Sequence, residues 1–354
     1  MAAASEMSVS GTTMILAALS VAVVSAVIVR TLVHRFRVAG IVDEVGVRSS
    51  HARPTPRGGG LGFVVAATTG WIAAAAWVPD PARTALVGVI VSGLLVASVG
   101  FLDDLRGVPA LGRLLVHLAA AGLGLWAIGC IQPAGPVLAG FAIISVAWCV
   151  NAFNFMDGTD AFAATHGVAL TGLLVILLQA DHGEDPVATT LALGTCAAVA
   201  GFLPFNWPRA RIFMGDVGSG WLGLTVALSL VASHRADAAA AVAGLAWLSP
   251  FLMDPTVCLV RRASRGERVW KAHRSHGFQN LSRRLGSHGR LLAVWWSVSL
   301  FIYLPLAWLS WRVGWWPWLP IALAAGVVQA LVLRSGVPGV AEQGPGSSTP
   351  QSRH

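Results

Sequence analysis

The sequence contains few charged residues for its length. Only 11% of its 354 residues are Asp, Glu, Lys or Arg, whereas 55% are hydrophobic and the mean hydropathy is +0.69. Soluble globular domains carry about 25% charged residues, so this deficit excludes an ordinary water-soluble enzyme. No collagen-like period and no long disordered tract accounts for the deficit. The composition therefore indicates a polytopic membrane protein.

Cysteine and lysine are also scarce. The four cysteines are far apart and include no closely spaced pair of the kind that binds metals. We interpret them as small buried hydrophobic residues and not as a disulfide framework. The basic residues are all Arg except Lys271, and this bias, together with abundant Ala and Gly, is typical of a GC-rich coding sequence.

Long apolar runs predict an all-α polytopic membrane protein with about eleven transmembrane helices (ten or eleven). A transmembrane helix needs about 20 apolar residues, and its backbone groups are satisfied within the segment. The predicted spans lie near 11–33, 61–79, 85–102, 112–130, 137–150, 166–180, 188–205, 219–233, 239–257, 292–311 and 315–333. We expect one transmembrane catalytic domain over residues 1–333 and a disordered cytoplasmic tail, rich in Gly, Pro, Ser and Gln, over 334–354.

The distribution of basic residues predicts the orientation. The leader MAAASEMSVS has no positive charge, and Arg30, Arg35 and Arg37 follow the first apolar run, which is the reverse of a cleaved signal peptide. We therefore expect a retained first helix with its N-terminus outside. All but three of the 24 Lys and Arg residues lie in or beside alternate loops, which the positive-inside rule makes cytoplasmic. The rule also explains the net charge of +8, so no nucleic acid partner is expected. The predicted cytoplasmic loops are 34–60, 103–111, 151–165, 206–218 and 258–291.

Two polar strings in these loops suit phosphate or metal chemistry. Arg57 lies in RPTPRGGG, and its three glycines would let backbone N–H groups approach a phosphate closely. A basic loop that touches lipid headgroups is the alternative. Asp103 and Asp104 directly follow an apolar run. Adjacent carboxylates repel, and a divalent cation or a transferred proton would relieve the repulsion, with a solvated pair as the alternative.

Two further strings place polar groups at the ends of apolar spans. Four polar side chains recur every three residues, namely Asn151, Asn154, Asp157 and Asp160. They would be neighbours on a helical turn and face protein or a polar cavity, which we favour over a simple helix cap. In the next string Asn206 precedes two arginines, and Asp216 lies between glycines where a span begins. This pattern favours an anionic ligand over a turn that only caps a helix.

The fifth string, AHRSHGFQ, contains His273, Arg274 and His276. Two histidines at this spacing could bind a metal, but Arg would oppose a cation, so phosphate or sugar contacts are favoured. Ordinary positive-inside charge is the alternative for the arginines of this loop. Together the strings offer carboxylates to Mg²⁺, which prefers oxygen ligands and shares them with substrate phosphates. They predict phosphoryl transfer from a nucleotide-linked donor to a lipid at the cytoplasmic surface.

The same strings resemble the polyprenyl-phosphate N-acetylhexosamine-1-phosphate transferases, glycosyltransferase family 4. The matching strings are RPTPRGGG, FLDD, NAFNFMDGTD, FNWPRARIFMGDVGSG and AHRSHGFQ, in family order between residues 43 and 279. Five ordered motifs on one predicted face are far more specific than a single DD or GD pair. The forms NFMDG and AHRSH are most similar to the branch that initiates bacterial O-antigen or capsule chains. For O-antigen this step belongs to lipopolysaccharide biosynthesis.

The resemblance implies that undecaprenyl phosphate attacks the β-phosphorus of a UDP-N-acetylhexosamine and releases UMP, in the bacterial inner membrane. It implies Mg²⁺, or alternatively Mn²⁺, bound by Asp216, Asp103 and Asp157, and catalytic roles for Asp103, Asp104 and Asp216. It leaves open whether an aspartate acts as a base or as a covalent nucleophile. The residues that it assigns to substrate binding are Arg57, Asn151, Asn154, Asp157, Asp160, Asn206, His273, Arg274 and His276.

One departure from the family and two alternatives accompany the resemblance. After Asp160 the family commonly has Gly-Leu-Ala, whereas this chain has Ala161-Phe162-Ala163, and we expect the change to reshape the wall of the cleft. The donor UDP-MurNAc-pentapeptide is less favoured, because the histidine run of peptidoglycan translocases is missing. A transporter is remote, because the spans carry almost no charge and show no internal repeat. The amino sugar, the polymer and the formation of a homodimer stay open.

Overall fold

The computed structural model describes residues 11–43, 54–132, 135–180, 185–268, 276–314 and 318–334, and 84% of the structure is helical. The helices are α1 Gly11–Val38, α2 Gly60–Ala75, α3 Ala82–Arg106, α4 Ala110–Ala127, α5 Gly135–Met156, α6 Phe162–Ala180, α7 Pro186–Asn206, α8 Asp216–Ala236, α9 Ala238–Ser264, α10 Gly277–Leu285, α11 His288–Val298, α12 Leu304–Val313 and α13 Trp318–Arg334. A π-helical turn, η1 Ser299–Tyr303, joins α11 to α12. Two short antiparallel strands, β1 Val42–Asp43 and β2 Thr55–Pro56, separate α1 from α2.

The helices confirm the predicted all-α polytopic membrane fold. Among the described residues, nine helical segments are long and apolar enough to cross a membrane, with His288–Val313 counted as one. The shorter apolar helices Gly60–Ala75 and Leu319–Leu331 match the two remaining predicted spans. Residues 335–354 of the predicted tail lie outside the described residues.

Several helices extend beyond the predicted spans at the ends that carry the polar strings. Helix α3 continues through Asp103 and Asp104, α5 continues to Met156, and α8 already begins at Asp216. Hydropathy ends a span at the first charged residue, but these side chains find partners inside the protein, so the backbone stays helical. The predicted 258–291 loop likewise contains the short helix α10.

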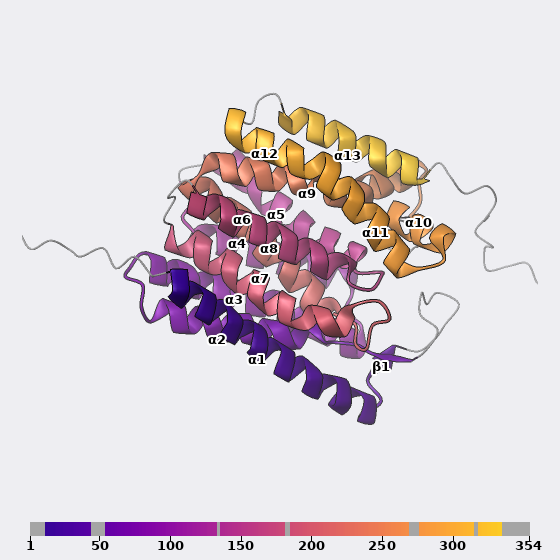
Figure 1. Ribbon diagram of the computed structural model, residues 1–354, viewed down its shortest axis with the longest axis horizontal. Helices are drawn as coiled ribbons and strands as arrows, with labels where there is room; N and C mark the ends of the chain where they lie inside the picture. Colours follow the sequence, from indigo (N-terminus) through magenta and orange to yellow (C-terminus); the bar gives the residue numbers. More distant parts are fainter. Residues whose placement is uncertain are drawn as a thin grey trace, which may run out of the picture.

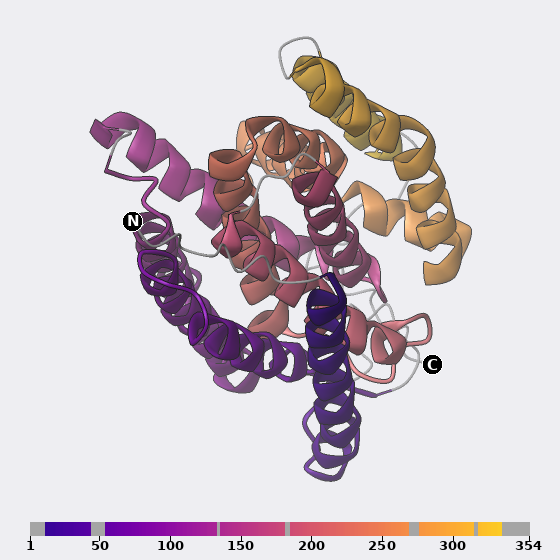
Figure 2. The same ribbon diagram turned by 60° about the vertical axis from the view of Figure 1, so that its left-hand side comes forward.

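Helix α8 lies at the centre of the bundle. It contacts α2, α3, α4, α5, α6, α7 and α9, and a helix that is apolar on all sides is stable only when buried in this way. Trp221 of α8 stacks on Trp71 of α2, with ring centroids 5.3 Å apart. Figure 2 shows the N-terminal helices (indigo and purple) and the C-terminal helices (orange and yellow) on different sides of this centre.

Glycines let α2 and α3 approach the first turn of α8 very closely. A Cβ on Gly60 would lie 2.3 Å from the Cα of Gly218, and a Cβ on Gly100 would lie 2.3 Å from the carbonyl oxygen of Asp216. Because both obstacles are backbone atoms, a side chain at either glycine would push the helices apart. The ends of α2, α3 and α8 are thereby fixed relative to one another.

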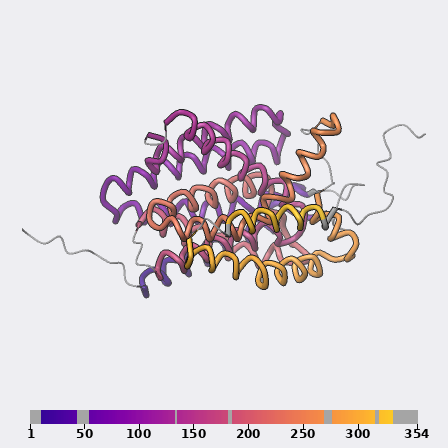
Figure 3. The backbone as a smooth tube through the Cα atoms, turned by 90° about the horizontal axis from the view of Figure 1, so that it is seen from above, coloured from indigo at the N-terminus to yellow at the C-terminus, as the bar shows by residue number. Residues whose placement is uncertain are grey.

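The polar strings gather at one end of the bundle. The helices run along a common direction, as Figure 3 shows. Figure 1 places β1, α10 and the C-terminal end of α1 together at one end of this direction. The ends of α3, α5 and α7 and the start of α8 meet there as well, through the contacts described below. The functional site is therefore built from helix ends on a single face.

Candidate active site

Three carboxylates and two arginines form one network where α3 meets α8. Arg57 donates from Nε to Oδ1 of Asp104, at 2.8 Å, and from Nη2 to Oδ1 of Asp216, at 2.7 Å. Nη1 of Arg113, in the first turn of α4, contacts Asp103 and also Oδ2 of Asp216, at 2.9 Å. The structure thus brings together the three aspartates that the sequence predicts to be catalytic.

Asp104 is the most enclosed member of the network. Its two oxygens accept the backbone N–H groups of Asp216, at 3.0 Å, and Val217, at 3.1 Å, which are the first two of α8. A carboxylate at a helix N-terminus satisfies free backbone donors and is favoured by the helix dipole. Gly215 is needed there, because its φ is +75° and a Cβ would lie 2.6 Å from Oδ2 of Asp104. Asp104 therefore fixes the position of Asp216.

Arg57 is held in the network by main-chain pairing. Phe213 donates its backbone N–H to the carbonyl of Pro56, and Gly59 and Gly60 donate theirs to the carbonyls of Phe213 and Met214. These two glycine N–H groups are used inside the protein, so the expectation that they approach an anion is wrong for them. The string instead carries the Arg57 side chain to the start of α8.

The two asparagines on α5 lie one turn apart but have different partners. Asn154 donates to Oδ2 of Asp216, at 3.3 Å, and accepts the hydroxyl of Ser219, at 2.9 Å, so it belongs to the network. Asn151 donates to the carbonyl of Ala147 within its own helix, at 2.7 Å. The structure therefore places Asn154 at the carboxylates and leaves Asn151 one helical turn away.

Asp160 and Asn206 connect the loop after α5 to neighbouring elements. Asp160 is buried and accepts the backbone N–H of Ala210, at 3.2 Å, and its Oδ2 lies 3.2 Å from Nδ1 of His288. Asn206 is also buried, accepts from the backbone of Ala161 and donates to the carbonyl of Ile212. Each of these two side chains ties three segments of this face together.

The fifth string is only partly described, because His273 and Arg274 lie outside the described residues. His276 is buried, and its ring stacks on Phe155 with centroids 5.7 Å apart. Next to it, the buried carboxylate of Asp254 in α9 accepts the backbone N–H groups of Gly277 and Phe278, both at 2.8 Å. Asp254 therefore holds the start of α10 against the bundle.

The donor set suits a hard divalent cation. In the described part of the chain, no three His, Cys, Asp or Glu side chains converge on one point. However, Asp103 and Asp216 converge on a single nitrogen, Nη1 of Arg113, so their oxygens already face one position for a positive charge. Mg²⁺ is commonly bound by one or two carboxylates, with waters and substrate phosphates completing its shell. The residues present therefore fit Mg²⁺, and Asp216 and Asp103 are the two that would hold it.

Comparison with known proteins shows which family this chain is similar to. The family model "Glycosyl transferase family 4" matches residues 86–234, a stretch that includes all three aspartates of the network. The chain is 31% identical to "Decaprenyl-phosphate N-acetylglucosaminephosphotransferase" of Mycobacterium tuberculosis (strain ATCC 25618 / H37Rv), over 70% of each chain.

The chain belongs to the polyprenyl-phosphate hexosamine-1-phosphate transferases of glycosyl transferase family 4. It is therefore an enzyme that transfers a phospho-sugar. Two further members are similar. The "Probable undecaprenyl-phosphate N-acetylglucosaminyl 1-phosphate transferase" of Bacillus subtilis (strain 168) is 27% identical, over 74% of this chain and 75% of its own. The "Phospho-N-acetylmuramoyl-pentapeptide-transferase" of Synechococcus sp. (strain RCC307) is 27% identical, over 74% of this chain and 78% of its own.

Three residues of this family member were missed by reasoning from the sequence. They are Arg113, Asp254 and His288. Arg113 could have been found, because it is a basic residue one turn into the helix that follows the double aspartate. Asp254 was also detectable in principle as a carboxylate within an apolar span, where an ionisable group signals function or a buried partner. His288 stands in no recognisable string.

The departure from the family motif lies in the core and not on an open surface. Ala161 and Phe162 are both fully buried, and the Phe162 ring stacks on Phe278 with centroids 4.9 Å apart. These side chains therefore do not line an open cleft, and the expectation that they reshape its wall is wrong. Phe162 instead packs the loop after α5 against α10.

Ala161 has a strained backbone, and this predicts a stabilising substitution. Its φ is +59°, in the left-handed region that glycine adopts without strain, and the family commonly has glycine there. We expect Ala161→Gly to raise the stability of the purified protein by about 1 kcal/mol, since left-handed alanine costs roughly 1–2 kcal/mol. Thermal unfolding in detergent measures the change. An unchanged or lower Tm would contradict the strain argument.

Asp157 predicts a pH-dependent stability. Burial, together with the nearby carboxylate of Asp216, raises the pKa of Asp157 well above its usual value. A raised pKa means that ionised Asp157 destabilises the folded protein. The free energy of unfolding therefore falls as the pH rises through the folded pKa of Asp157, and this loss of stability disappears at low pH.

We therefore expect Asp157→Asn to raise the Tm of the ligand-free protein at pH 8, by about 2–4 °C for each kcal/mol relieved. The difference between the variant and the native chain should shrink as the pH is lowered, because protonated Asp157 is also neutral. The Tm values of the variant and the native chain are measured by thermal unfolding at several pH values between about 5 and about 8. A difference that stays constant with pH would contradict the assignment.

Proposed function

We propose that this enzyme transfers N-acetylhexosamine-1-phosphate from a UDP-sugar to undecaprenyl phosphate, giving undecaprenyl-diphospho-N-acetylhexosamine and UMP. The observation that carries the proposal is the network of Asp103, Asp104 and Asp216 with Arg57 and Arg113 at one end of the bundle. A site for two anionic substrates needs fixed positive groups and aligned carboxylates, and this network supplies both.

The reaction joins an anionic nucleophile to an anionic diphosphate. A phosphate oxygen of the lipid forms a bond to the β-phosphorus of the donor, and the bond from that phosphorus to the oxygen bridging the two phosphates breaks. The electron pair leaves with that oxygen on UMP. Arg57 and Arg113 would reduce the repulsion between the reactants, and Asn154 would hold Asp216 in place.

Asp103 is the aspartate that we assign to the chemical step. It lies in the last turn of α3 and is held by the backbone N–H of Val108 and by Arg113, whereas Asp104 is occupied by Arg57 and the start of α8. Asp103 either accepts a proton from the lipid phosphate as a base, or attacks the β-phosphorus of the donor as a covalent nucleophile, releasing UMP, and is then displaced from that phosphorus by the lipid phosphate. Mg²⁺ bound at Asp216 and Asp103 would neutralise charge on the diphosphate.

We further propose that the site faces the cytoplasm of a bacterial inner membrane, with the N-terminus of α1 on the outer side. The support is the asymmetry of the basic residues between alternate loops. For the pathway we propose initiation of an O-antigen-like surface polysaccharide. The support is the form of the strings NFMDG and AHRSH, which also argues against UDP-MurNAc-pentapeptide as the donor.

A product assay tests the proposal. The purified protein in detergent is incubated with Mg²⁺, with undecaprenyl or decaprenyl phosphate, and with a panel of UDP-N-acetylhexosamines and UDP-MurNAc-pentapeptide. Free UMP and free UDP are quantified separately. Lipid-dependent UMP release that stops on chelation is the expected result, and the panel then ranks the donors. Release of UDP would mean glycosyl transfer and would overturn the proposed reaction. UMP release with UDP-MurNAc-pentapeptide as the only active donor would overturn the proposed pathway.

A further inference from the structure

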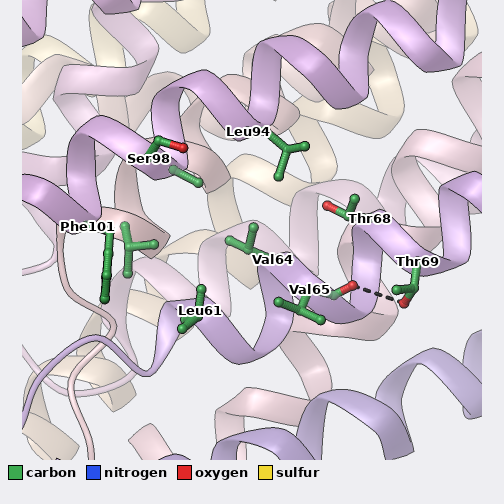
Figure 4. A pocket seen from close by; sticks show the side chains of 10 residues that line it. Leu61, Val64, Val65, Thr68, Thr69, Leu94, Ser98 and Phe101 are labelled. Carbon is green, nitrogen blue, oxygen red and sulfur yellow. Dashed lines mark hydrogen bonds between the residues drawn. The ribbon is translucent and has the colours of Figure 1, made fainter.

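His117 is a buried polar residue that the network of carboxylates and arginines does not use. It lies in α4, one turn beyond Arg113, and is 4% exposed. Several polar side chains in the spans are satisfied by a carbonyl of their own helix, as Figure 4 shows for Thr69, whose hydroxyl donates to Val65 at 3.0 Å. Among the described residues, by contrast, Nδ1 of His117 is buried without a hydrogen-bond partner of good geometry. An ionisable side chain in an apolar span indicates a function or a specific partner.

Asn151 of α5 is the neighbour that can hold the ring of His117. Its side chain lies within hydrogen-bonding range of that ring, and its Nδ2 already donates to the carbonyl of Ala147, at 2.7 Å. The amide oxygen of Asn151 remains to accept a ring N–H. A neutral imidazole that donates from one nitrogen keeps an acceptor lone pair on the other. The pair therefore offers an acceptor nitrogen inside the bundle, which suits an N–H of a guanidinium group.

Arg113 stands where a divalent cation would bind. Its Nη1 contacts both Asp103 and Asp216, the two carboxylates that fit Mg²⁺. Mg²⁺ lies about 2.1 Å from its oxygen ligands, so the ion and Nη1 cannot share the position between the two carboxylates. The Arg113 side chain must therefore turn away when the ion binds. It is 28% exposed and has no other hydrogen-bond partner among the described residues, so it can turn while α4 stays in place.

We propose that His117 is the second partner of Arg113 and receives its guanidinium group when a divalent cation takes the position of Nη1. The inference rests on the cation site of the proposed function, but not on the reaction itself. Residues four apart on a helix are neighbours, and the side chain at the later position leans toward the earlier one. His117 and Arg113 stand in this relation, and Arg113 and Asp103 both lie within electrostatic range of the His117 ring. The exchange keeps the charge of Arg113 beside the site and leaves both carboxylates to the ion.

Binding of Mn²⁺ alone tests the proposal without any substrate. Electron paramagnetic resonance measures the free Mn²⁺ over the purified protein in detergent and gives the Kd. We expect His117→Leu to raise this Kd at least about tenfold, because Arg113 loses its second partner and competes with the ion for the carboxylates. Asn151→Leu should act in the same direction, since the ring is then no longer held. His117→Gln should bind Mn²⁺ as the native chain does, because its amide oxygen also accepts an N–H.

The control for these variants is His166→Leu. This buried histidine of α6 has both ring nitrogens in use, since Nδ1 lies 2.9 Å from the carbonyl oxygen of Phe162 and Nε2 accepts from Trp295. It is not part of the network, so its replacement should leave the Kd for Mn²⁺ unchanged. Thermal unfolding shows which variants are folded.

Removal of Arg113 gives the deciding comparison. In Arg113→Ala the competing charge is absent, so Mn²⁺ should bind at least as tightly as in the native chain, and adding His117→Leu should change the Kd no further. Equal weakening in both backgrounds would mean that His117 acts on the ion directly, and would overturn the proposal. An unchanged Kd in His117→Leu alone would mean that Arg113 turns to water instead, and would overturn it too, as would a native chain that binds no Mn²⁺. None of these outcomes depends on UMP release, which tests the proposed function separately.

Discussion

Asp216→Asn is expected to reduce lipid-dependent UMP release by about 10³-fold or more, the scale of losing a central electrostatic group in an active site. Asp216 accepts from both arginines and from Asn154, and it is one of the two carboxylates that face a common cation position. The amide removes the negative charge and leaves two guanidinium groups with one carboxylate fewer. Asp103→Asn is expected to have a loss of the same order, because Asp103 is the other carboxylate at that position.

The control for these variants is Asp237→Asn. Asp237 also stands at a helix N-terminus, where its Oδ1 accepts the backbone N–H of Ala239 at the start of α9, but it lies at the other end of α8. Asparagine caps a helix as well as aspartate does, so this variant should keep both its activity and its Tm. Membrane insertion and thermal unfolding are measured for all three. Near-normal turnover in Asp216→Asn or Asp103→Asn would refute the role assigned to that residue.

The sequence predicts which residues form the site better than it predicts which of them contact one another. The double aspartate, Asn154 and Asp216 were identified because each follows or begins an apolar helix, where an ionisable or polar group requires a partner. Their helical ends also explain why they meet, since alternate helix ends lie on one face. The pairing itself could not be predicted, because Arg113 and Asp216 are far apart in the chain and meet only when α4 packs beside α8.

Other parts of the site depend on packing that no local pattern encodes. The glycines of RPTPRGGG were interpreted as phosphate-binding, yet Gly60 serves the close contact with Gly218. In both cases glycine allows a close approach because it has no side chain. The sequence alone does not show whether the group that approaches is an anion or the backbone of a neighbouring helix. The role of Asp254 is hidden in the same way, because its partners are backbone N–H groups of α10 and not side chains. Backbone partners leave no trace in residue identity.

Replacing each of the two arginines by lysine is expected to separate their roles. Arg57 uses two different nitrogens, Nε for Asp104 and Nη2 for Asp216, and a single ammonium group cannot reproduce this fork. Arg113 contacts both of its aspartates with one nitrogen, Nη1, and an ammonium group can occupy that point. The geometry therefore predicts that lysine replaces Arg113 but not Arg57.

We expect Arg57→Lys to lower kcat by about 10²–10³-fold, whereas Arg113→Lys should stay within about tenfold of the native enzyme. Arg113→Ala should fall to the level of Arg57→Lys, because the site then loses a fixed positive charge that offsets the repulsion between its two anionic substrates. Rates of UMP release at saturating donor and lipid measure the effects, and thermal unfolding shows that each variant is folded. If Arg57→Lys kept near-native activity, as Arg113→Lys is expected to, the two arginines would act only through their charge, and the fork of Arg57 would have no special role in aligning Asp104 with Asp216.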